Sequence, residues 1–257
     1  RPPRSTLFPY TTLFRSYAGV PKWSLRVRGN GFIREDFIKG IEEAHAMGKK
    51  VHAVLNIIPH VRRVAAFEKV VDEMAQLKPD AFIMADPGLI DIVRNRYPDI
   101  PIHLSVQANT VNAGSVKFWQ KVGLTRCILA RELSLTEIDM IKQECPDMEI
   151  EVFAHGALCI AVSGRCLISG LLSHRDANIG ACNNSCRYGF NIRNVHAATA
   201  DDVTTFEADD GTTLSAQIEE SMHHPGEWMT MEEDLNGSYL MNSKDLCTLP
   251  VLKKLID

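Results

Sequence analysis

Short apolar runs alternate with amphipathic helical patterns through most of this chain, and this alternation constrains the fold more than any other feature. Successive runs of strand length are separated by about 20–30 residues. A helix between successive strands is the connection that a parallel sheet requires. We therefore predict an α/β fold with strands at Val51–Ile57, Ala81–Ala85, Ile102–Val106, Cys127–Ala130 and Ile150–Phe153, and an earlier one at Ser24–Val27.

Helical patterns fill the intervals between these strands, and several carry signals for helix ends. Ser134 followed by Glu137 predicts a capping box, and Asp86 and Asn112 are candidate N-caps. Gly48 is a candidate C-cap. The predicted helices cover Glu35–Met47, Val61–Leu77, Leu89–Tyr97, Ala113–Val122 and Leu135–Cys145.

Polar residues follow nearly every predicted strand, and this distribution favours a barrel over an open sheet. A (β/α) barrel collects functional groups from many strands at its carboxyl-terminal rim. A doubly wound sheet gathers them at one crevice, and no strand here is followed by the Gly-x-Gly-x-x-Gly motif. We predict an incomplete TIM-like barrel, with rim candidates Arg26, Arg28, Asn56, Gln107, Asn109, Arg131, Glu132, Glu151 and His155.

Four of the seven cysteines lie in one stretch after the last predicted strand, spaced C-x6-C-x15-C-x3-C at Cys159, Cys166, Cys182 and Cys186. Thiolates grouped on a loop suit a soft-ligand metal, either an iron–sulfur cluster or zinc. The long first interval fits a zinc ribbon poorly, so a cluster is favoured, with zinc and unligated thiols as alternatives. An odd cysteine number in a chain of 257 residues predicts reduced thiols and a cytoplasmic protein.

Composition excludes several classes of protein. The hydrophobic fraction of 45% is too high for a disordered chain. With 28 basic and 32 acidic residues the net charge is −4, so no global positive field indicates nucleic acid or acidic lipid. Because no apolar run reaches membrane-spanning length and no secretory signal is evident, we expect no membrane partner.

The chain divides into four predicted segments. Residues 1–16 lack periodicity and resemble a translated sequencing adapter, so they are set aside as a non-native leader. Residues 17–186 form the barrel with its cysteine loop at the carboxyl-terminal rim, and 187–226 form a polar loop. Residues 227–257 hold a β-hairpin around Asn236-Gly237 and the start of a truncated helix from Ser243. We expect a fragment cut at both ends.

The stretch Glu151–Cys159, continued by Ser163–Ser169, resembles the signature of the collagenase-like peptidases of unknown catalytic type, family thirty-two of the U class. Within that family it is most similar to the bacterial tRNA wobble-uridine hydroxylation proteins. Further stretches that agree are Asn56–His60, Ser105–Asn112, and Pro225–Trp228 with Tyr239–Leu246.

This resemblance implies a TIM-like barrel with a [4Fe-4S] cluster on the four loop cysteines. It also implies conversion of the tRNA wobble uridine to 5-hydroxyuridine, without oxygen and with prephenate as a required metabolite. On this interpretation Arg26, Arg28 and Arg131 bind a carboxylate or phosphate. Asn56, Gln107 and Asn109 read a base edge, and Glu132, Glu151 and His155 carry protons.

Two other functions stay open. The family name suggests a peptidase, and His155, four residues before Cys159, leaves a Cys–His pair conceivable. However, neither Gly-x-Ser-x-Gly nor His-Glu-x-x-His occurs in the chain. The other alternative is a cluster-containing scaffold that binds tRNA or transfers electrons to a protein partner.

Overall fold

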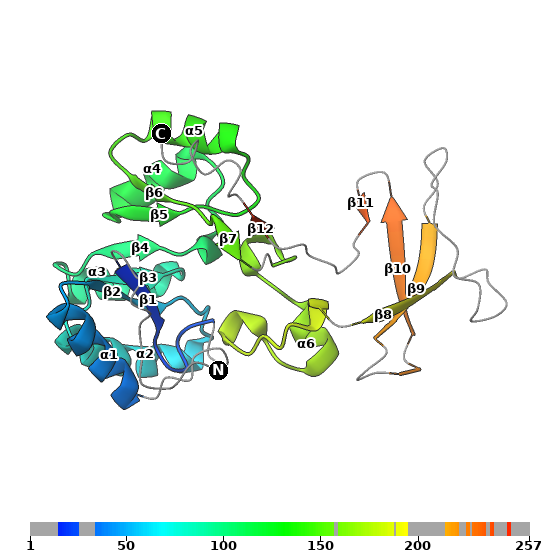
Figure 1. Ribbon diagram of the computed structural model, residues 1–257, viewed down its shortest axis with the longest axis horizontal. Helices are drawn as coiled ribbons and strands as arrows, with labels where there is room; N and C mark the ends of the chain where they lie inside the picture. The colour runs from blue at the N-terminus through cyan, green and yellow to red at the C-terminus, as the bar shows by residue number, and fades with distance from the viewer. Residues whose placement is uncertain are drawn as a thin grey trace. The chain divides into compact units, whose positions relative to one another are not determined.

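The computed structural model describes residues 15–25, 34–156, 159–187, 189–194, 214–220, 225–226, 228–234, 237–238 and 246–247 (Figure 1). The chain divides into two compact units, Arg1–Asn183 with Asp245–Asp257, and Asn184–Lys244. Most of the predicted leader and the candidates Arg26 and Arg28 lie outside the described residues.

Six parallel strands form one sheet in the first unit, and each strand pairs with its neighbours in sequence. Helices connect the strands, so the predicted α/β fold and its partial TIM-like barrel are confirmed (Figure 1). The strands are β1 (Arg15–Gly19), β2 (Lys50–Leu55), β3 (Ala81–Met84), β4 (Ile102–Leu104), β5 (Arg126–Ile128) and β6 (Glu149–Glu151).

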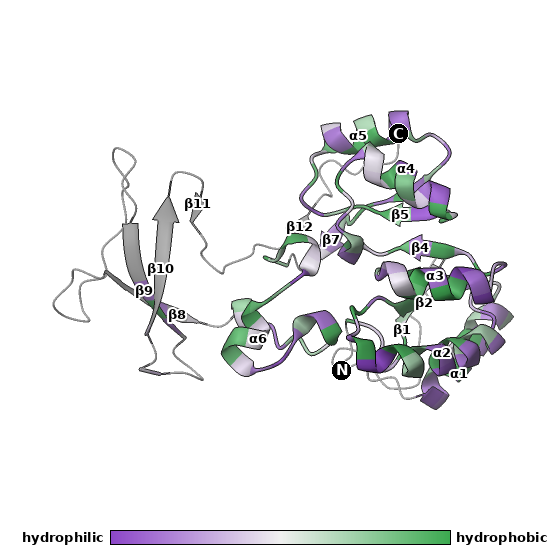
Figure 2. Cartoon of the chain, turned by 180° about the vertical axis from the view of Figure 1, so that it is seen from behind, coloured by the Kyte–Doolittle hydropathy of each residue, from purple (hydrophilic) through white to green (hydrophobic). Residues whose placement is uncertain are grey.

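The helices bury one apolar face and expose a polar one. In α2 the fully buried residues are Phe67 and Val71, which pack in the same core cluster as Val51 and Leu55 of β2. Hydrophilic residues colour much of α1 and α2 purple in Figure 2. The helices are α1 (Arg34–Ala46), α2 (Val61–Gln76), α3 (Pro87–Arg96), α4 (Ala113–Val122) and α5 (Leu135–Glu144). Among the described residues, none of the helices is long and apolar enough to span a bilayer.

The first strand lies earlier than the sequence predicts. β1 begins at Arg15, two residues inside the segment assigned to the leader, and pairs residue by residue with Lys50–Val54. Ser24 and Leu25 belong to the turn that follows β1, so the strand predicted at Ser24–Val27 is wrong at these two residues. Arg26 and Val27 lie outside the described residues. The β1 sequence is short and poor in β-branched residues, and it is a strand because its backbone pairs with β2.

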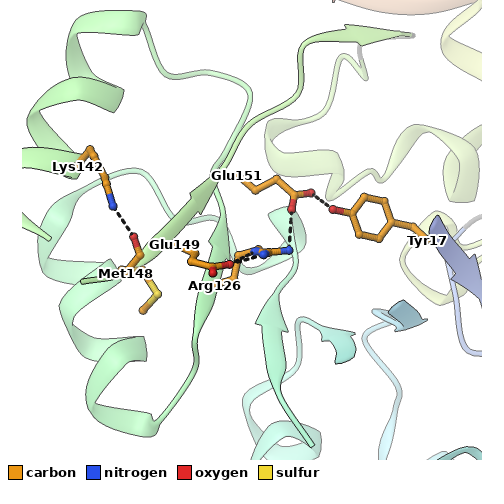
Figure 3. Close-up of polar contacts among 6 residues, drawn as sticks. All are labelled: Tyr17, Arg126, Lys142, Met148, Glu149 and Glu151. Carbon is orange, nitrogen blue, oxygen red and sulfur yellow. Dashed lines mark hydrogen bonds and ion pairs between the residues drawn. The ribbon is translucent and has the colours of Figure 1, made fainter. Parts of the chain in front are cut away.

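The sheet curves so that its first and last strands approach on one face. The Tyr17 hydroxyl of β1 donates to Oε1 of Glu151 at the end of β6, at 2.6 Å (Figure 3). These residues are 134 positions apart, and four strands separate them in the sheet. A flat sheet could not bring its two edges within one hydrogen bond.

The predicted helix caps are confirmed. Asp86 accepts from the backbone N–H of Leu89 at 3.0 Å, and Asn112 accepts from that of Ser115 at 2.8 Å. Ser134 and Glu137 form both bonds of a capping box. The hydrogen bonds from the Ser134 backbone and hydroxyl lower the pKa of Glu137, because they favour its charged form.

After β6 the regular barrel pattern gives way to short elements. β7 (His155–Gly156) is followed by the turn η2 (Val162–Gly164), helix α6 (Ile168–Ser173) and the turn η3 (Ala177–Ile179). β12 (Leu246–Cys247) pairs antiparallel with β7. The helix predicted from Ser243 is therefore wrong at Leu246–Cys247, where pairing with a distant strand decides the conformation.

The second unit contains an antiparallel sheet of four strands in the order β11-β10-β9-β8. β10 and β11 pair antiparallel, as a hairpin here requires, but Gly237, predicted to be a turn residue, lies in β11 and pairs with Asp234. The polar loop predicted over 187–226 is wrong where β8 and β9 lie, because strands such as Phe190–Asn194 alternate apolar and polar residues and so contain enough polar residues to resemble a loop. These strands are β8 (Phe190–Asn194), β9 (Leu214–Glu220), β10 (Trp228–Asp234) and β11 (Gly237–Ser238).

Replacing the cap residue Asn112 with alanine should destabilise the first unit by about 1 kcal/mol, since the Ser115 N–H loses its acceptor. Asn95→Ala, at an exposed position near the end of α3, is the matched control and should change stability little. Urea unfolding followed by circular dichroism measures both. Equal free energies of unfolding for the two variants would show that the Asn112 cap contributes nothing.

Candidate functional site at the barrel rim

Residues 163–165, here called the anchor segment, are hydrogen-bonded to the rim of the barrel. The backbone N–H of Ser163 donates to Glu132 Oε1 at 2.8 Å, and its hydroxyl donates to Asn109 Oδ1 at 2.7 Å. Glu132 follows β5, and Asn109 follows the short turn η1 (Val106–Ala108) after β4. One buried serine thus connects the ends of two strands to the chain that leads into the cysteine loop.

Gln107 binds the same segment through its side chain and its backbone. Its Nε2 donates to the carbonyl of Gly164 at 3.2 Å, and its own carbonyl accepts from Arg165 Nε at 2.9 Å. Three predicted site residues, Gln107, Asn109 and Glu132, therefore contact the anchor segment. The structure gives them a role in positioning that segment, and their roles toward substrate stay predictions.

Gly164 is required by both conformation and space. Its φ is +75°, in the region that favours glycine, and a Cβ built there would lie 2.8 Å from Gln107 Nε2. Any side chain would displace the amide that holds the Gly164 carbonyl. The close contact between Gln107 and the anchor segment therefore depends on this glycine.

Asn56 also bridges parts of the barrel. Its Oδ1 accepts from the backbone N–H of Leu25 at 3.1 Å, and its Nδ2 donates to Ser105 Oγ at 3.0 Å. These bonds join the turn after β1, the end of β2 and the end of β4. The Asn56 amide is therefore engaged within the protein, and its predicted contact with a base edge stays a prediction.

Arg131 differs from these residues because its side chain makes no hydrogen bond or ion pair with the described residues. Among the described residues no carboxylate pairs with it, and its Nε is buried without a hydrogen-bond acceptor. The guanidinium carbon lies 5.6 Å from the centre of the Phe153 ring. After β4, two more buried polar atoms have no hydrogen-bond partner in the described part of the chain, namely Gln107 Oε1 and Thr110 Oγ1. A buried polar atom left unpaired costs about 1–3 kcal/mol, which a bound water or ligand offsets.

The candidate proton carriers do not form one group. Glu151 accepts from Tyr17 and lies 3.5 Å from Arg126 Nη1, and the same guanidinium binds Glu149 through its Nε and Nη2 (Figure 3). His155 is exposed on β7, where its backbone pairs with Cys247. Within the described residues no hydrogen bond joins Glu132, Glu151 and His155 to one another.

The cysteines divide into core and loop groups. Cys127 and Cys145 are buried in the hydrophobic core, and burial raises the pKa of the Cys127 thiol to about 12. Cys166 is buried in the loop, whereas the remaining three loop cysteines, Cys159, Cys182 and Cys186, are half-buried. None of these six cysteines forms a disulfide in the described part of the chain.

The chemistry of the loop donors fits a metal that prefers thiolates. The chain around Cys166 is linked to that around Cys182, since Ser169 Oγ donates to Asn183 Oδ1 at 2.9 Å and accepts from the Asn183 N–H at 3.4 Å. Over the described ranges no three His, Cys, Asp or Glu side chains are close enough to form a metal site.

Several polar residues on the inner face of the sheet were missed from the sequence. The ring centroids of Tyr17 and His52 lie 5.3 Å apart, and those of His52 and His103 lie 4.6 Å apart. His103 of β4 is also in register with Arg126 of β5. The sequence does contain a signal for them, because successive side chains of a strand point to opposite faces of the sheet. Val51 and Ala53 are core residues, so His52 between them must face the other side.

Gly164→Ala should loosen the cysteine loop while the barrel stays folded. The new methyl group displaces Gln107, so the anchor segment loses a hydrogen bond and adopts a strained φ. We expect faster alkylation of Cys166 in the apo-protein, quantified by peptide mass spectrometry. Gly170→Ala, in α6 with open space around it, is the control. An unchanged alkylation rate in Gly164→Ala would contradict the role given to this contact.

Comparison with known proteins identifies the family. The model of peptidase family U32 matches residues 15–257. "tRNA hydroxylation protein P" of Escherichia coli is 49% identical over 93% of this chain and 55% of its own length. The Haemophilus influenzae protein of the same name is 45% identical over the same shares. The Escherichia coli "23S rRNA 5-hydroxycytidine C2501 synthase" is 34% identical over 69% of this chain and 26% of its own length.

The solved structure of the U32 peptidase Mk0906 has 14% sequence identity and a TM-score of 0.48, covering 55% of this chain and 60% of that chain. The chain spans about half the length of the first two relatives. Because the family match covers nearly all of the sequence, the chain belongs to peptidase family U32.

Proposed function

We propose that this chain acts in tRNA modification, as an iron–sulfur protein that hydroxylates the wobble uridine to 5-hydroxyuridine. The observation that carries the proposal is the 49% identity, over 93% of the chain, to a protein named for tRNA hydroxylation. A second relative, named as a 5-hydroxycytidine synthase of rRNA, is also named for hydroxylation of a pyrimidine. This shared chemistry supports a hydroxylase over a hydrolase.

The proposed reaction explains why a redox group is needed. Replacing the C5–H of uridine with C5–OH is a two-electron oxidation of the base: with water as the oxygen source it releases two electrons and two protons, and the electrons must pass to an external two-electron acceptor because acid–base side chains cannot take them. A [4Fe-4S] cluster would pass these electrons on one at a time, and Cys159, Cys166, Cys182 and Cys186 are the residues that would hold it. Their thiolate chemistry, without disulfides among the described residues, and their position on one loop fit this group, with zinc as the alternative.

Arg131 is the residue we propose for substrate binding. A half-buried guanidinium without a carboxylate partner in the described part of the chain is a site for an anion. Prephenate or a similar small carboxylate, and the phosphates of tRNA, both provide one. Arg131 also follows β5 directly, next to Glu132, which binds the anchor segment of the cysteine loop.

A Cys–His peptidase is less well supported. Activation of a thiol by histidine needs the two side chains within hydrogen-bond reach. In the described residues no side-chain hydrogen bond joins the His155 imidazole to a cysteine thiol or a carboxylate, and His155 meets Cys247 through backbone strand pairing alone. A scaffold that passes electrons to a protein partner would be recognised by copurification of that partner and by loss of activity without it.

The cluster is tested on protein purified without oxygen, by its visible spectrum and its iron and sulfide content. We expect a brown protein, and loss of iron and sulfide when each of the four loop cysteines is changed singly to serine. Cys145→Ala, a core cysteine outside the loop, is the control and should keep both. A colourless protein after anaerobic reconstitution would exclude the cluster, and zinc bound in the same sample would favour the zinc alternative.

Arg131→Ala should lower the 5-hydroxyuridine content of tRNA at least about tenfold, since a lost charge-assisted hydrogen bond costs about 1.5–3 kcal/mol. The variant is expressed in a bacterial strain without its own tRNA hydroxylation protein, and nucleosides are quantified by mass spectrometry. Iron and sulfide should stay at the wild-type level. Arg34→Ala, which removes an exposed ion pair with Glu73, is the control. Normal 5-hydroxyuridine in Arg131→Ala would contradict the binding role.

A further inference from the structure

We propose that Asn178 is a positioning residue for the metal-binding thiols, and that it holds Cys166 and the chain leading to Cys182 at the barrel rim. The inference rests on the proposed thiolate-bound cluster. Asn178 itself is neither a proposed metal ligand nor a proposed substrate contact. The positioning role depends on the hydrogen bonds of the Asn178 side-chain amide.

The Asn178 amide binds Cys166 at both of its backbone polar groups. The N–H of Cys166 donates to Asn178 Oδ1 at 3.2 Å, and Asn178 Nδ2 donates to the carbonyl of Cys166 at 3.0 Å. Two bonds from one planar group fix both the position and the orientation of the residue they hold. The backbone from which the Cys166 thiol extends is therefore fixed, although a loop rather than a strand carries it.

Asn178 is itself fixed to the barrel. Its carbonyl accepts from the N–H of Ile58, just after β2, at 3.0 Å. Its own N–H donates to Asp176 Oδ1 at 2.8 Å, and the Asp176 carbonyl accepts from Ala181 N–H at 3.0 Å. The turn of residues 176–181 is thus closed on itself and tied to the end of β2. Cys182 is the next residue in the chain.

Cys166 consequently lies between two fixed points. The anchor segment directly before it is bound to the ends of β4 and β5, and Asn178 binds Cys166 itself. Ser169 and Asn183 form a second link between the same two stretches of chain. Replacing Asn178 leaves the Ser169–Asn183 link in place but removes both hydrogen bonds that hold the backbone of Cys166, the most buried of the described loop cysteines.

Only an asparagine side chain satisfies both bonds from this position. The Cys166 N–H needs an acceptor and its carbonyl needs a donor, and an amide provides one of each. Aspartate provides the acceptor alone and places a negative charge beside the thiolates. Alanine provides neither, and glutamine is one methylene longer. The pair of variants Asn178→Ala and Asn178→Asp therefore separates loss of the contact from a change of charge.

The experiment measures iron release from the anaerobically reconstituted 257-residue chain into excess chelator, together with thermal stability. Asn178→Ala should release iron about tenfold faster than wild type, since outer-shell substitutions weaken metal binding about 10–100-fold. Asn178→Asp should also shift the midpoint potential of the cluster to a more negative value, because it adds negative charge nearby. Asn112→Ala removes one side-chain hydrogen bond in which no loop cysteine takes part, and it is the stability-matched control.

The outcomes separate the two proposals. Faster release in both Asn178 variants, with wild-type release in Asn112→Ala, supports the positioning role. Wild-type release and potential in both folded Asn178 variants would overturn it while the cluster proposal stands. If Asn178→Ala fails to fold, Asn178→Asp, which keeps the size and one bond, decides between these results. A wild-type chain that takes up no iron overturns the cluster proposal and this inference with it.

Discussion

The parallel pairing of β1 to β6 is the constraint on which the rest of the structure depends. Parallel strands must be joined by crossover connections, so the helices between them lie over one face and bury the apolar residues there. The same pairing places the carboxyl ends of all six strands along one rim. Side chains as far apart in sequence as Asn56 and Glu132 therefore belong to the same edge of the sheet.

The rim contains many polar groups, and most of them bind other parts of the protein. Asn56 joins strands, while Gln107, Asn109 and Glu132 hold the anchor segment. A polar group with its hydrogen bonds already made gains less from a ligand than one without. This difference distinguishes Arg131, which has no counter-charge in the described structure, from its engaged neighbours.

The other face of the sheet is unusually polar. Arg126, with a side chain only 11% exposed, pairs with Glu149 and Glu151, and Glu151 also accepts from Tyr17. Removing one partner from such a group would leave a buried charge unpaired, which is far more costly than the pair itself is stabilising. Because Tyr17 and Glu151 belong to the two edge strands, this network also stabilises the curvature of the sheet.

The sequence by itself determined the alternation of strands and helices, the caps at Asp86, Asn112 and Ser134, and the family to which the cysteine loop belongs. These features depend on periodicity and on contacts within a few residues, which a single sequence records. It did not determine that β1 starts at Arg15, that Leu246–Cys247 pairs with β7, or that Asn178 binds Cys166. Tertiary structure decided these, because each depends on hydrogen bonds to a partner brought near only by the folded chain.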